Sequence, residues 1–132
     1  MGLLITAFYA SLLALCYLYL SAVVISVRRR EQISLGHGDS PELERLSRVH
    51  GNFSEYVPIT IILLACLESL GAFGWVLHIG GSLLLFGRVI HAYGLRHHHG
   101  TSWQRVTGMM FTFGAMLFLA TANLYMIHYT VV

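Results

Sequence analysis

Long apolar stretches alternate with short polar segments along this chain. The apolar positions fill about residues 3–27, 57–67, 75–95 and 105–129. A helix of about 20 residues rises roughly 30 Å, which is the thickness of the hydrocarbon core of a bilayer. The pattern therefore predicts an all-α membrane protein, a bundle of four transmembrane helices in a single domain that covers residues 1–132.

The second predicted helix begins well before its apolar stretch. Ser40 can cap a helix N-terminus, Pro41 suits the first helical position, and Glu42 and Glu44 suit the positive end of the helix dipole. We expect this helix to start in the aqueous loop, to enter the membrane near Asn52 and to end near residue 70. Pro58 lies in its interior and should kink it.

Composition supports the membrane assignment and narrows the possible partners. Hydrophobic residues make up 56% of the chain and charged residues 11%, whereas about 25% is usual for a soluble domain. The net charge of +2 is too small to suggest nucleic acid as a partner. Cys16 and Cys66 lie in different apolar stretches, and neither they nor the adjacent histidines 97–99 have the spacing of a metal site.

Arginine is distributed unequally between the two ends of the predicted bundle. The first and third loops with their flanks hold seven of the eight arginines, at positions 28, 29, 30, 45, 48, 96 and 105. The second loop, around residues 71–74, and both termini hold none. The positive-inside rule therefore predicts that loops one and three are cytoplasmic and that both termini are non-cytoplasmic.

A polar stripe opens the membrane part of the second helix. Arg48, Asn52 and Glu55 are spaced i, i+4, i+7, so they share one helix face. Such groups are costly at a bilayer unless they face a partner, a cavity or a ligand. The stripe is the best candidate for a functional site, and the alternative is an internal ion-pair network that only joins helices. Glu68, near the other end of the same helix, is expected to face solvent or a neighbouring subunit instead.

Two segments also resemble a known family. Residues 48–58, R-x-H-x-N-x-x-E-Y-x-P, resemble the second-helix signature of the MAPEG family, the membrane-associated proteins in eicosanoid and glutathione metabolism. Residues 86–94, FGRVIHAYG, resemble its bacterial members. The resemblance implies a homotrimer in a bacterial inner membrane, with a glutathione pocket at each subunit interface.

The resemblance also assigns roles to particular residues. Arg105 matches the arginine that stabilises the glutathione thiolate, so it is the predicted catalytic residue; the alternative is an interfacial anchor. The side chains expected to bind glutathione are Arg28, Arg48, His50, Asn52, Glu55, Tyr56, Arg88, His91 and Tyr93. For Arg28 the alternative is a membrane-surface anchor, and for Arg88 a structural partner.

These residues together suggest one class of ligand. Four antiparallel spans bring arginines from separate helices to one side of the membrane, beside the carboxylate of Glu55. Glutathione fits because it carries two carboxylates, an ammonium group and a thiol that a guanidinium would help to ionise. We therefore predict a membrane glutathione transferase, which could also act as a peroxidase, with glutathione as co-substrate and a lipophilic small molecule or lipid as second substrate.

The sequence departs from the eicosanoid-forming members of the family in the third helix. His91 and Leu95 stand where those members have pocket tyrosines, and Tyr93 is out of register. This difference weakens the prediction of an eicosanoid as the substrate. It also keeps open a different function, that of a non-enzymatic lipid-binding or scaffold protein with the same fold.

Overall fold

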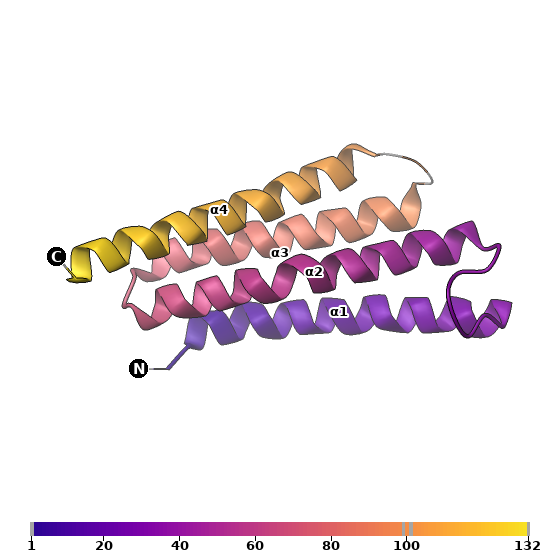
Figure 1. Cartoon of the computed structure of the whole chain (residues 1–132), viewed down its shortest axis with the longest axis horizontal. Helices are drawn as coiled ribbons and strands as arrows, with labels where there is room; N and C mark the ends of the chain where they lie inside the picture. Colours follow the sequence, from indigo (N-terminus) through magenta and orange to yellow (C-terminus); the bar gives the residue numbers. More distant parts are fainter. Residues whose placement is uncertain (1, 99, 101, 132) are drawn as a thin grey trace.

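The computed structural model describes residues 2–98, 100 and 102–131, and in this part of the chain it contains helices and no strands. The helices are α1 (Leu4–Glu31), α2 (Pro41–Ser69), α3 (Gly74–His97) and α4 (Trp103–Val131) (Figure 1). All four are long and apolar enough to cross a membrane. The all-α class and the four predicted spans are thus confirmed.

The helices form an open, antiparallel bundle. The α1–α2 and α3–α4 connections lie at one end, and the α2–α3 turn and both chain termini lie at the other (Figure 1). Among the described residues α2 and α3 each pack against the other three helices, whereas α1 and α4 do not touch each other. All the arginines predicted to be cytoplasmic are therefore near one end of the bundle, and the side of the membrane on which that end lies stays a prediction.

The helix ends form where the sequence signals predicted them. Ser40 Oγ accepts a hydrogen bond from the backbone N–H of Leu43 at 3.2 Å, and Pro41 is the first residue of α2. Gly36 and Gly71 have φ angles of +65° and +78°, which only glycine adopts without strain. The helix α2 then runs without a break through Pro58.

A side-chain cap from a distant part of the chain was not expected. The carboxylate of Glu68, near the end of α2, accepts hydrogen bonds from the backbone N–H groups of Ile5 (2.9 Å) and Thr6 (2.7 Å). The start of α1 has no side-chain cap of its own, so Glu68 satisfies N–H groups that would otherwise be unpaired. Glu68 is thus directed to the start of α1 in the same chain and is half-buried there, so a neighbouring subunit is not needed to explain it.

Glycines bring α3 and α4 into close contact. A Cβ added at Gly108 would lie 2.6 Å from the carbonyl oxygen of Gly87, and one added at Gly80 would lie 2.4 Å from Leu119 Cδ2. Both distances are far below van der Waals contact, so the helices could not approach this closely with larger residues. A Cβ added at Gly114, on the same helix as Gly108, would have no neighbour within 4 Å.

We expect Gly108→Ala to destabilise the protein by about 1–3 kcal/mol, because the new methyl group meets backbone atoms that cannot rotate away. Gly114→Ala is the matched control, and it should leave stability unchanged or raise it by up to ~1 kcal/mol through helix propensity. Thermal unfolding in detergent, followed by circular dichroism, measures both. Equal midpoints for the two variants would contradict the close α3–α4 contact.

Candidate functional site

A buried arginine lies at the centre of the candidate site. Arg88 is 1% exposed, and it lies nine residues, or about 14 Å of helix rise, from the end of α3. Its Nη1 donates a hydrogen bond to Asn52 Oδ1 at 2.7 Å, and its Nη2 donates to Met109 Sδ at 3.2 Å. Arg88 thus joins α2, α3 and α4 at one point inside the bundle.

The charge of Arg88 is not balanced within the described part of the chain. Both of its acceptors are neutral, its Nε has no hydrogen-bond partner, and no ion pair is present at this residue among the described positions. A buried charge without a counter-ion is costly, and within a membrane the cost is higher still. An anion from outside these residues would remove the cost.

Two further basic side chains lie on the loop side of Arg88. His91 is 6% exposed and lies within electrostatic range of both Arg88 and Arg105. Arg105 is in the first turn of α4, where its Nη1 donates to the carbonyl oxygen of Gly100 at 3.3 Å. Met109, which contacts Arg88, is four residues or about 6 Å further along α4 than Arg105.

The outer members of the α2 stripe point away from the bundle interior. Arg48 and Glu55 are exposed, and the described residues offer neither of them a hydrogen bond or an ion pair. Asn52, between them, is turned inward to Arg88. The internal-network interpretation therefore fits Asn52, whereas Arg48 and Glu55 are open to a ligand or to another subunit.

Tyr56 lies next to this face of α2. It is half-buried, and its ring packs edge-on against Phe113 of α4 with a centroid distance of 5.3 Å. Tyr56 is also within electrostatic range of Arg88. It therefore borders the same region between α2, α3 and α4.

Other residues predicted to bind glutathione are directed elsewhere within this chain. Arg28 donates to the loop carbonyl of Gly36 at 2.7 Å. His50 Nε2 hydrogen bonds with Ser21 Oγ at 2.9 Å on the α1 side of α2. His50 follows Arg48 by two residues, which is about 200° around a helix, so the two cannot face the same site from one subunit.

Tyr93 is also separate from Arg88. It is exposed, and its ring packs against His97 at a centroid distance of 4.4 Å. His98 approaches Gln104, and His99 lies outside the described residues. Met109 was missed from the sequence, because a methionine in an apolar helix gives no signal that its sulfur will accept a hydrogen bond from a buried arginine.

Comparison with known proteins identifies the family. The model of the MAPEG family matches residues 6–125 of this chain. The chain belongs to the MAPEG family. The inner membrane protein YecN of Escherichia coli, in strain K12 and in the O6:H1 strain CFT073 alike, is 40% identical over 121 residues, which cover 92% of this chain and 91% of the relative.

Family membership confirms the resemblance seen in residues 48–58 and 86–94. Together with four helices able to span a bilayer, it shows that this protein is a multi-pass integral membrane protein. Asn52 and Arg88, which are joined by a hydrogen bond, come from these two MAPEG-like segments.

Substitutions of Asn52 test whether Arg88 needs a counter-ion. Asn52→Ala removes an acceptor from a buried cation and should cost about 1.5–3 kcal/mol of stability. Asn52→Asp places a carboxylate at the same point, so in the absence of ligand its unfolding midpoint in detergent should equal or exceed that of the parent. If Asn52→Asp lowers the unfolding midpoint as much as Asn52→Ala does, Arg88 does not require an anion.

Proposed function

We propose that this protein is a glutathione transferase of a bacterial inner membrane, which activates the glutathione thiol toward lipophilic electrophiles. The observation that carries the proposal is Arg88, a buried cation without a counter-ion among the described residues. Its hydrogen-bond partner Asn52 lies on α2 between the two exposed charges of the stripe, Arg48 and Glu55. His91 lies within electrostatic range of both Arg88 and Arg105. The inner-membrane location is inferred from the name of the E. coli relative.

The spacing of these charges suits a tripeptide. Arg48 and Glu55 are seven residues apart on α2, or about 10 Å of rise, and an extended tripeptide spans about 10–11 Å. Glu55 offers a partner for the ammonium group at one end of glutathione, and Arg48 can bind a carboxylate bidentately at the other end. The second carboxylate would supply the anion that Arg88 lacks.

Arg105 is the proposed catalytic residue. A free thiol has a pKa of about 8.5, so at neutral pH only a small fraction of glutathione is thiolate. A guanidinium next to the sulfur stabilises the thiolate, and a two-unit decrease in the pKa needs roughly 2.7 kcal/mol. With an aryl halide as second substrate, a carbon–sulfur bond forms, the halide leaves with its bonding electrons, and the thiol proton passes to water.

The same thiolate could serve a peroxidase reaction. Two glutathione molecules are oxidised to the disulfide while one lipid hydroperoxide is reduced to an alcohol and water. Both reactions use the same binding residues, so the proposal does not require a second site.

A homotrimer would complete the site. Arg48 and Glu55 are exposed on a helix that enters the membrane, where charges are costly unless another protein surface covers them. A closed symmetric assembly covers such a face in every subunit. It also places residues of a neighbouring subunit, Arg28 and His50 among them, in positions that one chain alone does not give them.

The assembly has a direct test. In a neutral detergent, with bound detergent subtracted, sedimentation should give three times the chain mass of 14.7 kDa. Glu55→Arg, which places like charges on the exposed face, should shift the protein to smaller species. A monomer of full activity would contradict a shared interface site.

The second candidate function is non-enzymatic binding of lipid as a scaffold. The position of Tyr93, outside the region around Arg88, favours it, because the third helix then lacks the pocket tyrosines of eicosanoid-forming members. Titration calorimetry separates the two candidates. Heat of binding at millimolar glutathione supports the transferase, and its absence supports the scaffold.

Arg105→Ala should reduce conjugation of a small aryl halide by about 100-fold or more, as expected when a group that stabilises developing charge is removed. Binding of glutathione, measured by calorimetry, should weaken much less, because the other charged residues remain. Arg29→Ala, at an exposed arginine of the same end of the bundle, is the control and should keep full activity. Full activity in Arg105→Ala would refute the catalytic assignment.

A further inference from the structure

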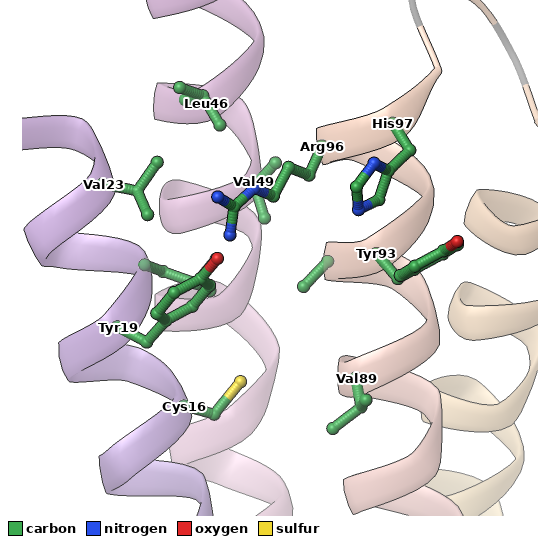
Figure 2. Close-up of a pocket in the computed structure, with 11 residues that line it drawn as sticks. Cys16, Tyr19, Val23, Leu46, Val49, Val89, Tyr93, Arg96 and His97 are labelled. Carbon is green, nitrogen blue, oxygen red and sulfur yellow. The ribbon is translucent and has the colours of Figure 1, made fainter. Parts of the chain in front are cut away.

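A groove runs between α1 and α3, with α2 as its floor (Figure 2). Its apolar part has a volume of about 220 Å³. The side chains that form it come from all three helices: Cys16, Tyr19 and Val23, then Leu46 and Val49, then Val89 and Ala92. No residue of α4 takes part among the described positions, so the groove is open on one side.

Toward the loop end this groove continues into a polar mouth. The mouth has a volume of about 340 Å³ and shares Tyr19, Val23, Leu46 and Arg96 with the apolar part. It adds Arg30, Arg45 and Glu42. Arg96 is the residue that the polar mouth and the apolar part share and that carries a positive charge.

Arg96 lies at the junction of the two parts. Its side chain extends from α3 across the groove toward α1, where the guanidinium lies 5.3 Å from the centroid of the Tyr19 ring (Figure 2). Arg30, by contrast, is paired with the carboxylates of Glu31 and Glu42. Arg96 therefore offers the cation that a bound anion would meet directly above the apolar part.

This groove lies away from the exposed stripe of α2, although Cys16 in its wall is within electrostatic range of Arg88. Leu46, in its floor, and Glu55, in the stripe, are nine residues apart on α2. Nine residues correspond to about 180° around a helix of 3.6 residues per turn, so Leu46 and Glu55 lie on opposite faces of α2.

We propose that the groove binds an anionic membrane phospholipid, with one acyl chain in the apolar part and the phosphate on Arg96. Pockets that enclose a whole small ligand have volumes of about 300–1,000 Å³, so 220 Å³ suits part of an elongated molecule whose remainder extends into the bilayer. The guanidinium of Arg96 complements a phosphate, and basic pockets between transmembrane helices bind anionic headgroups in this way. The proposal does not depend on the glutathione reaction.

Cys16 provides a reporter inside the groove. In the Cys66→Ser background it is the only cysteine of the chain. In neutral detergent we expect phosphatidylglycerol to slow alkylation of Cys16 by a maleimide, whereas phosphatidylcholine with the same acyl chains should not. Inorganic phosphate alone should give no protection, which distinguishes a lipid from a free anion.

In Arg96→Gln, the lipid concentration needed to protect Cys16 to the same extent should rise by about tenfold or more, as expected for the loss of a charge-assisted hydrogen bond. Arg96→Lys should retain most of it, and Arg29→Gln, which removes a charge outside the groove, should retain all of it. Val89→Trp, at an exposed position on the wall of the groove, should prevent protection by filling the apolar part.

Two results would overturn the proposal. Equal protection by the two lipids, or unchanged protection in Arg96→Gln, would show that the headgroup is not recognised. Protection without lipid that increases with protein concentration would show that a second copy of the chain covers the groove.

Discussion

The hydrogen bond between Arg88 and Asn52 fixes the centre of the bundle. It joins the buried Arg88 of α3 to the half-buried Asn52 of α2, and Met109 adds a contact from α4. Neutral acceptors satisfy part of the hydrogen-bonding capacity of a guanidinium but leave its charge unbalanced. The packing of three helices thus depends on a cation that would be more stable with an anion nearby, so an anion bound there would also stabilise the fold.

The helices themselves were largely predictable because their signals are local. Ser40 and Pro41 specify where α2 begins, and Gly71 allows the tight turn that follows it. Contacts between distant residues gave no such signal. Glu68 caps the N-terminus of α1 from more than sixty residues away, and no pattern within either segment indicates that their ends meet.

The candidate site was predictable in its residue types and only in part in its geometry. The i, i+4, i+7 spacing placed Arg48, Asn52 and Glu55 on one face, yet Asn52 points inward and the other two outward. A difference of about 40° between positions four residues apart is enough to change the direction of a side chain at the edge of a helix interface. The role of Met109 and the direction of His50 depend on which helices become neighbours, and a single sequence does not contain that information.

The two proposed binding regions share one structural element. Arg88 and Arg96 are eight residues apart on α3, which corresponds to about 12 Å of rise and about 80° around the helix. A lipid phosphate on Arg96 would hold the loop end of α3 against α1, and that is the same part of the helix that carries His91. Since α3 also packs against α4 through Gly87 and Gly108, restricting its motion would restrict the start of α4, where Arg105 lies. If both proposals hold, a lipid in the groove and a ligand at Arg88 would affect each other through the position of α3.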